Sequence, residues 1–277
     1  MGIGQITLTH LNQQERRTVK KYGTWQKFIR GPRLDNDSLL ASLDEFSNPI
    51  LLAGCQRSGT TILTRIIAGS AGFSSLALTD DDELDAALAL SGKIILPKET
   101  RYCFQTTYLN ERYVEYRTVS PRQKLIWVLR NPESVVHSML YNWKRFALNE
   151  LYEACGVRRV RAARLHRVRM PWPLGPSALE KACWSYVAKT EQLLEIRNWF
   201  PDENLLVVDY DALVSASDRW LPRLFELVCE PYDERYGEAL SKSSLVKKDA
   251  LSGGQKRVIA DIARPAYDRC IEYVSVL

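Results

Sequence analysis

The chain has 277 residues, of which 45% are hydrophobic and 26% are charged. This balance excludes a disordered chain and predicts one large domain, or one domain with a long insertion. The longest apolar runs are much shorter than the roughly 18 residues of a membrane-spanning helix. The net charge of +5 and the pI of about 8.8 favour anionic partners, and leave nucleotides, nucleic acids, membranes and acidic substrates open.

The first residues, MGIGQITLTHLN, lack a basic region followed by an apolar run, so the sequence predicts no secretory signal and a cytoplasmic location. Six cysteines are widely spaced without a C-x-x-C pair, and the three histidines form no H-x-x-x-H pair. We therefore expect reduced, mostly buried thiols and no metal site.

Strands and helices are predicted to alternate after a poorly patterned lead-in, residues 1–48. Short apolar runs rich in β-branched residues predict buried strands at 49–53, 93–96, 124–129 and 205–208. Helical periods occur at 60–71, 132–148, 177–199, 218–229 and 254–273. This order predicts an α/β fold, with an open parallel sheet flanked by helices and a single domain over 1–277. Residues 145–176, rich in arginine and then in proline, are interpreted as an insertion that covers the substrate.

Ligands of such sheets bind at the carboxyl ends of the strands. The loops that start at Gly54, Pro97 and Arg130 are therefore expected at one edge of the sheet.

The first of these loops, GCQRSGTT at residues 54–61, has the spacing of a phosphate-binding loop. Such a loop presents backbone N–H groups and the positive end of a helix dipole to an anion. The alternative interpretation is an ordinary strand-to-helix turn without a ligand. Thr60 stands where a nucleotide triphosphatase needs its lysine, and Arg57 lies upstream. The loop therefore favours a donor with one phosphate at its 5′ position. That condition is met by 3′-phosphoadenosine 5′-phosphosulfate (PAPS).

A donor of this kind needs a second anion site for its 3′-phosphate. The stretch RNPESVVHS, residues 130–138, ends a predicted strand in Arg130 and starts a helix with Asn131 as cap and Pro132 at the first position. Ser138 lies about two turns into this helix and adds a hydroxyl. The stretch predicts a second helix N-terminus with an arginine beside it.

Together these motifs resemble those of the PAPS-dependent sulfotransferase family. The first resembles the arginine-bearing 5′-phosphosulfate loop of bacterial small-molecule members and of tyrosylprotein sulfotransferases. The stretch NLLVVDYDALV, residues 204–214, is similar to the family's strand that ends in Y-E-D-L. The resemblance covers roughly residues 49–230, and implies a fold like that of the P-loop nucleotide kinases.

The resemblance also implies roles for individual residues. Arg57, Ser58, Gly59, Thr60 and Thr61 would bind the 5′-phosphosulfate. The 3′-phosphate would be bound by Arg130 and Ser138. Lys256 and Arg257, in LSGGQKR at 251–257, match weakly a basic segment near the family's C-terminus and are predicted to reach this phosphate. The same stretch imitates a signature of ABC transporter ATPases, but the lysine-bearing loop of those proteins is absent here. We interpret Ser252 as the cap of the last helix.

Sulfuryl transfer to a hydroxyl or amine needs positive charge on the transferring oxygens and a base for the acceptor proton. Arg57 and Lys98 are the predicted cations, although Lys98 also fits a solvated loop lysine. Tyrosylprotein sulfotransferases and several bacterial members place a carboxylate after the first helix. We therefore predict a base in the acidic cluster Asp80, Asp81, Asp82 and Glu83, chiefly among its three aspartates, with Glu99 as the next candidate. The alternative is a helix start capped by Thr79 or Asp80.

The predicted function is therefore a metal-independent sulfotransferase that uses PAPS, releases 3′,5′-adenosine bisphosphate (PAP) and modifies a small-molecule acceptor. A P-loop kinase is the alternative, because LLVVD at 205–209 imitates its second motif. A nucleic-acid-binding protein is a third hypothesis, based on the arginine-rich stretch 158–169, which lacks interleaved aromatic residues. Neither membrane nor nucleic acid is expected as a partner, and oligomeric state is not predicted.

Overall fold

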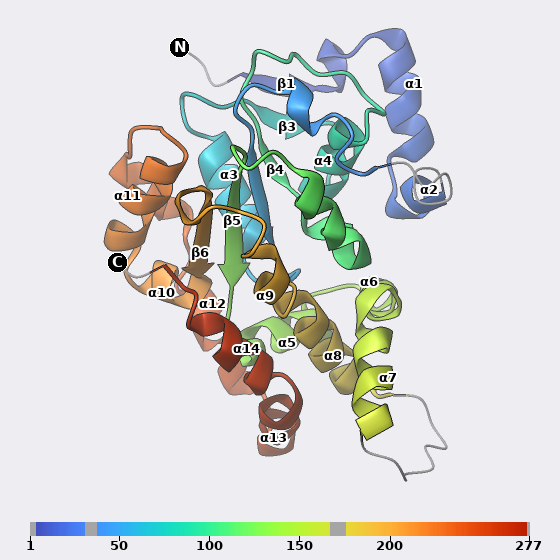
Figure 1. Cartoon of the computed structure of the whole chain (residues 1–277), viewed down its shortest axis with the longest axis vertical. Helices are drawn as coiled ribbons and strands as arrows, with labels where there is room; N and C mark the ends of the chain where they lie inside the picture. Colours follow the sequence, from blue (N-terminus) through green and yellow to red (C-terminus); the bar gives the residue numbers. More distant parts are fainter. Residues whose placement is uncertain (1–3, 31–37, 167–175, 276–277) are drawn as a thin grey trace.

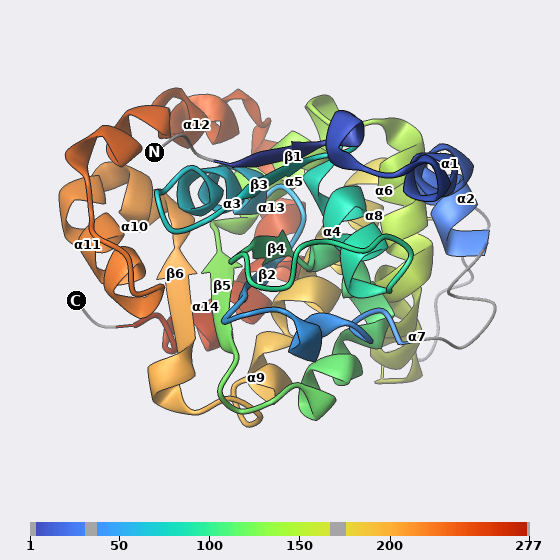
Figure 2. The same cartoon turned by 90° about the horizontal axis from the view of Figure 1, so that it is seen from above.

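A computed structural model describes residues 4–30, 38–166 and 176–275 of the chain. Within them, four parallel strands form a sheet in the order β4-β2-β5-β6. Figure 2 shows the four strands in this order across the molecule. Their bounds are β2 Ile50–Gly54, β4 Cys103–Gln105, β5 Lys124–Leu129 and β6 Leu205–Asp209. Because all are parallel, their carboxyl ends lie at one edge of the sheet.

Helices flank this sheet and continue beyond its carboxyl edge (Figure 1). Their bounds are α1 Gln13–Tyr22, α2 Trp25–Arg30, α3 Thr60–Ala68, α4 Asp82–Leu90, α5 Pro132–Tyr141, α6 Arg145–Leu151, α7 Val157–His166, α8 Ala178–Thr190, α9 Leu193–Ile196, α10 Tyr210–Ser215, α11 Ser217–Leu227, α12 Ser243–Val246, α13 Gly253–Ile262 and α14 Arg264–Ile271. A 3₁₀ helix covers Thr107–Thr118, and a π-helix, Tyr152–Gly156, joins α6 to α7.

Alternate residues of the strands pack against different helices. Ile50 and Leu52 of β2 lie in one core with α3, α10 and α11. Leu51 and Ala53 lie in a second core with α4, α9, α14 and the 3₁₀ helix. Since successive side chains of a strand point to opposite faces, both faces of the sheet are covered, as the near-continuous apolar runs predict.

A third core lies among helices α5, α6, α8 and α13. It is built from α5 residues such as Val135 and Met139, with Leu151 of α6 and Tyr186 of α8. This core holds the helix that follows β5 in a fixed position at the carboxyl edge of the sheet.

The lead-in is more regular than its sequence suggests. It contains α1, α2 and the short strand β1, Gln5–Thr7, which pairs in parallel with β3, Ser75–Ala77. Val19 and Phe28 are buried in the same core as α4. The lead-in therefore packs against the segment that carries the predicted acidic base.

The predicted α/β fold with a parallel sheet is confirmed, and one strand prediction is wrong. Residues 93–96 are not a strand. The N–H groups of Lys93 and Ile94 donate to the carbonyl oxygen of Leu88, because the chain reverses at the end of α4 through Gly92. The strand beside β2 is β4 instead, at residues 103–105.

Three long predicted helices are interrupted. Helix 132–148 is divided into α5 and α6, 177–199 into α8 and α9, and 254–273 into α13 and α14. Pro265, in the first turn of α14, explains the last break because proline cannot donate a backbone hydrogen bond. Among the residues described, no helix combines the length and apolarity needed to cross a membrane.

Gly59 offers a direct test of this architecture. Its φ of 105° is unfavourable for other residues, and a Cβ there would lie 2.3 Å from the Tyr210 ring. Gly59→Ala should therefore lower the free energy of unfolding by about 2 kcal/mol or more, measured by urea denaturation. Gly253→Ala is the matched control, since its Cβ meets no atom within 4 Å. Equal stability of the two variants would contradict the close packing at Gly59.

Candidate active site

The loop between β2 and α3 has the conformation of an anion-binding loop. Gly54 and Gly59 have φ values of 144° and 105°, which only glycine adopts readily. The Ser58 hydroxyl donates to the Cys55 carbonyl oxygen at 2.6 Å and is buried. Ser58 thus fixes the loop by its side chain, while α3 begins at Thr60 with its N–H groups directed to the loop.

Arg57 extends from this loop to the neighbouring helix. Its Nε donates to the Ser138 hydroxyl of α5 at 3.1 Å. The arginine has a positive φ of 71°, an unusual conformation for a residue with a side chain. The structure therefore brings together the first motif and the serine of the second.

The second motif forms the helix start that its sequence predicts. Asn131 caps α5 by accepting from the Glu133 N–H, and Pro132 occupies the first turn. The guanidinium of Arg130 is 8% exposed, pairs with Asp211 at 3.0 Å and lies over the ring of Tyr210. Burial raises the pKa of Asp211, and the positive charges of Arg130 and Lys248, which lower this pKa, offset the effect only in part.

These groups line a cavity of about 420 Å³, which we name the anion cavity. It contains Arg57 and Arg130 together with hydroxyl residues from the starts of α3 and α5, namely Thr60, Thr61, Ser134 and Ser138. The Ser134 hydroxyl is buried without a hydrogen-bond partner. Two helix N-termini and the guanidinium groups of Arg57 and Arg130 at one cavity suit a ligand with two separate anionic groups, while the third lining arginine, Arg65, pairs with Asp82.

The acidic segment 80–83 also lines the anion cavity. Asp81 is the cap of α4, because its carboxylate accepts from the N–H groups of Glu83 and Leu84. The alternative interpretation of this segment placed the cap at Thr79 or Asp80. Asp82 pairs with Arg65 at 2.8 Å, and Asp80 is exposed. Two of the three predicted bases therefore have structural partners.

Glu83 is the member of this segment whose environment fits a base. It accepts a hydrogen bond from Gln105 Nε2 at 3.1 Å, and Gln105 also donates to the Thr60 hydroxyl. Burial, followed by the nearby Asp81 charge, raises the pKa of Glu83 to about 7. A carboxylate with this pKa is well matched to accept a proton near neutral pH.

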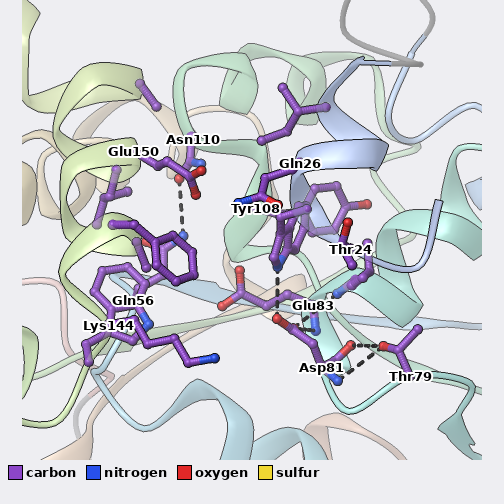
Figure 3. Close-up of a pocket in the computed structure, with 18 of the residues that line it drawn as sticks. Thr24, Gln26, Gln56, Thr79, Asp81, Glu83, Tyr108, Asn110, Lys144 and Glu150 are labelled. Carbon is purple, nitrogen blue, oxygen red and sulfur yellow. Dashed lines mark hydrogen bonds between the residues drawn. The ribbon is translucent and has the colours of Figure 1, made fainter.

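A second cavity, of about 610 Å³, adjoins the first. We name it the aromatic cavity, after Trp25, Tyr108, Trp143 and Phe146, which line it. It shares five lining residues with the anion cavity: Gln56, Asp80, Asp81, Glu83 and Trp143. Figure 3 shows Glu83 and Gln56 among the residues around it. Glu83 thus lies where the two cavities meet.

A buried polar network supports this junction. Lys189 of α8 is 2% exposed and donates to the Thr107 carbonyl oxygen at 2.9 Å. Gln56 Nε2 donates to the same oxygen and to Asn110 Oδ1. Burial lowers the pKa of Lys189. Since Thr107 also forms a side-chain hydrogen bond with Glu83, Lys189 fixes a residue that contacts the candidate base.

Lys98 does not join this site, so the expectation that its loop reaches the carboxyl edge is wrong. Its carbonyl oxygen accepts from Ser47, just before β2 begins, and its ammonium pairs with Glu45 at 2.9 Å. The lysine therefore lies at the amino end of the sheet. The error follows from the absent strand at 93–96.

Lys256 and Arg257 lie in the first half of α13 and line neither cavity. Ser252 caps this helix as predicted, and Gln255 donates to the Tyr141 hydroxyl of α5. The helix thus lies near the second motif. Of the basic residues near the C-terminus, it is Lys248 whose charge acts on Asp211, in addition to that of Arg130.

Two site residues carried no signal in the sequence. Gln105 of β4 and Lys189 of α8 belong to different elements, and only the fold brings them near the two motifs. Tyr210 lies in the third motif, but its contacts with Gly59 and Arg130 were not predicted. Glu83 was included in the acidic segment, but its role depends on where α4 begins. In the described part of the chain, no group of three histidine, cysteine or carboxylate side chains has the arrangement of a metal site.

Comparison with known proteins assigns residues 47–246 to a family model described as the sulfotransferase domain. No curated protein sequence matches. Similar solved structures include a sulfotransferase domain from the curacin biosynthetic pathway, with 12% identity over 76% of this chain and 96% of that chain and a TM-score of 0.49. Sulfotransferase STF9 from Mycobacterium avium has 11% identity, covering 97% and 93%, with a TM-score of 0.49. A mouse sulfotransferase complexed with PAP has 15% identity, covering 87% and 96%, with a TM-score of 0.48.

The anion cavity predicts that inorganic sulfate stabilises the protein. At constant ionic strength, sulfate at ten times its dissociation constant should add about 1.4 kcal/mol to the free energy of unfolding. Arg57→Ala and Arg130→Ala should lose most of this effect in thermal unfolding. Arg235→Ala is the control, since that exposed arginine pairs with Asp233 away from the cavity. An equal sulfate effect in all variants would show that the cavity does not bind the anion.

Proposed function

The chain belongs to the sulfotransferase family, and we propose that it transfers the sulfuryl group of PAPS to a hydroxyl or amine of a small molecule. The enzyme class is the one that the two sequence motifs predicted. The observation that carries the proposal is the meeting of the two cavities at Glu83, with Arg57 in the wall of the anion cavity. A donor and an acceptor bound in adjoining cavities can react there without leaving the protein.

We assign one anionic group of the donor to each helix N-terminus at the anion cavity. The 5′-phosphosulfate would lie at the start of α3, against Arg57, Thr60 and Thr61. The 3′-phosphate would lie at the start of α5, against Arg130, Ser134 and Ser138. Arg130 would then be shared between the phosphate and Asp211, which holds its guanidinium in position.

The reaction then needs one bond formed and one broken. The acceptor oxygen or nitrogen attacks sulfur while the bond from sulfur to the bridging oxygen of the 5′-phosphate breaks. The acceptor proton moves to the Glu83 carboxylate, and PAP leaves with the electron pair on its phosphate. Arg57 and the N-terminus of α3 stabilise the charge that develops on the transferring and leaving oxygens.

Glu83 is a better base than the three aspartates that precede it. Its carboxylate lines both cavities and has a pKa near neutrality. Asp81 and Asp82 are held by the α4 cap and by Arg65. We therefore assign the base to the last residue of the predicted acidic cluster, in place of its three aspartates.

The lead-in and the insertion supply the acceptor side. Thr24 and Trp25 come from the lead-in, while Phe146 and Glu150 come from the first part of the predicted insertion 145–176. Residues 167–175 of this insertion lie outside the described residues. A cavity of 610 Å³ is in the range that small molecules occupy, which supports a small acceptor. A cytoplasmic location remains a prediction.

The kinase alternative has weaker support. Thr60 occupies the place of the lysine that would contact β- and γ-phosphates. The carboxylate of Asp209, at the end of the imitated second motif, caps α10 and accepts from the Tyr267 hydroxyl. These contacts occupy both of its oxygens.

Calorimetry with PAP and with Mg-ATP separates the two functions. We expect micromolar or tighter PAP binding and much weaker ATP binding. Arg130→Ala should weaken PAP binding by about 100-fold, as expected for a lost charge-assisted contact. Arg57→Ala should reduce turnover more than PAP affinity, because Arg57 acts on the transferring group. Tight ATP binding without PAP binding would contradict the proposal, and salt-sensitive oligonucleotide binding would favour the nucleic-acid hypothesis.

The pH dependence of turnover tests Glu83. Because the base must be deprotonated, kcat/KM measured with limiting donor should rise with pH through about 7. With donor bound, its negative charges raise the pKa of Glu83 further, so the rise in kcat should occur at higher pH. Glu83→Gln should remove this rise and reduce turnover by at least about 100-fold at pH 8.

Asp80→Asn and Asp82→Asn are the matched controls for Glu83→Gln. Both should keep the pH profile of the unmodified protein. If Glu83→Gln retains turnover and either aspartate variant loses it, the base is assigned to the wrong residue.

A further inference from the structure

The aromatic cavity has rings on two sides. Trp25 of α2 and Tyr108 of the 3₁₀ helix line one side, with ring centroids 5.9 Å apart. Trp143 and Phe146 come from the α5–α6 connection and from α6. Figure 3 shows the blue ribbon of the lead-in and the yellow-green ribbon of α6 on opposite sides of the cavity. Rings from separate elements thus face a common space, which suits a flat ligand.

Trp25 is held in place beside the base. Its indole Nε1 donates to Asp81 Oδ2 at 2.8 Å, and its ring packs edge-on against Phe28 at 5.6 Å. Asp81 in turn caps the helix that carries Glu83. A ring fixed in this way offers a flat apolar surface at a defined position relative to Glu83.

The charges of the aromatic cavity disfavour anions. Its described lining residues include four carboxylates, Asp80, Asp81, Glu83 and Glu150, and one ammonium, that of Lys144. Lys144 is exposed, with Nζ 5.9 Å from the centroid of the Phe146 ring. The phosphates of a donor in the adjoining cavity would add further negative charge. An acceptor with its own carboxylate, sulfate or phosphate would therefore meet like charges.

We infer that the acceptor is an aromatic hydroxyl compound without an anionic group, and that Trp25 determines this choice. The inference rests on the proposed sulfuryl transfer from PAPS. The acceptor ring lies against Trp25, whose position the buried Tyr108 supports from behind, with its hydroxyl directed to Glu83. The remainder of the molecule extends toward α6, where a neutral or ammonium group is accepted and a carboxylate is excluded.

Three phenols of similar size test the charge preference. Tyramine carries an ammonium group, 4-hydroxyphenethyl alcohol is neutral, and 4-hydroxyphenylacetate carries a carboxylate. Calorimetry on the PAP-loaded protein gives their dissociation constants without turnover. We expect the amine and the alcohol to bind at least about tenfold more tightly than the carboxylate, the effect of about 1.4 kcal/mol of charge repulsion.

Substitutions of Trp25 test its part in this choice. Trp25→Ala should weaken binding of the amine and the alcohol by about tenfold, while PAP affinity stays within about twofold. Trp25→Phe keeps a ring but not the bond to Asp81, and should recover most of the affinity. Tyr141→Ala is the control, since this exposed aromatic residue lines neither cavity. Retained PAP binding shows that each variant is folded.

The outcomes distinguish this inference from the proposed function. If PAP binds and the carboxylate binds as tightly as the amine, the inference is wrong and the donor chemistry stands. The same holds if no phenol binds, or if Trp25→Ala leaves phenol binding unchanged. If PAP itself does not bind, the proposed function fails and this inference fails with it.

Discussion

The ring of Tyr210 contacts both of the motifs that line the anion cavity. It is the first residue after β6, and it packs so closely on Gly59 that no other residue fits there without displacement. The guanidinium of Arg130 lies 4.7 Å from the centroid of the same ring. One side chain therefore sets the separation between the loop after β2 and the arginine after β5. Any ligand that spans both motifs depends on this separation.

Glu83, the candidate base, is connected to the loop after β2 through a different strand, β4. Glu83 belongs to α4, which packs on one face of the sheet, and β4 brings Gln105 to it at the carboxyl edge. Gln105 also contacts the Thr60 hydroxyl, so the candidate base and the phosphate loop share a hydrogen-bond partner. Lys189 and Gln56 also donate hydrogen bonds to the carbonyl oxygen of Thr107, which follows shortly after β4. The position of Glu83 relative to the loop after β2 is thus fixed by buried and partly buried polar contacts and not by a surface loop.

The sequence was sufficient for features that depend on local backbone geometry. Glycine spacing after an apolar run, and the Asn131 cap with Pro132, predicted both helix starts because these signals act within a few residues. Residues 93–96 were misread because Ile94, Ile95 and Leu96 form a short apolar run like that of a buried strand. In the structure Ile95 is exposed, so this run is not buried on both sides. The true strand β4 has only three residues, too few for a periodic signal. Trp25 and Lys189 could not be assigned, since their partners lie 56 and 82 residues away.

The family match begins at residue 47, whereas Trp25 and α2 precede it. Both loop motifs and Glu83 lie within the matched segment, and part of the wall of the aromatic cavity lies outside it. The residues proposed for the reaction therefore lie inside the matched segment, and some of those proposed to contact the acceptor lie before it. A relative could keep the donor loops and the base, exchange its first forty-odd residues, and present a different wall to a different molecule. The hydrogen bond from Trp25 to Asp81 is the contact through which a different N-terminal segment would have to fit the helix that carries Glu83.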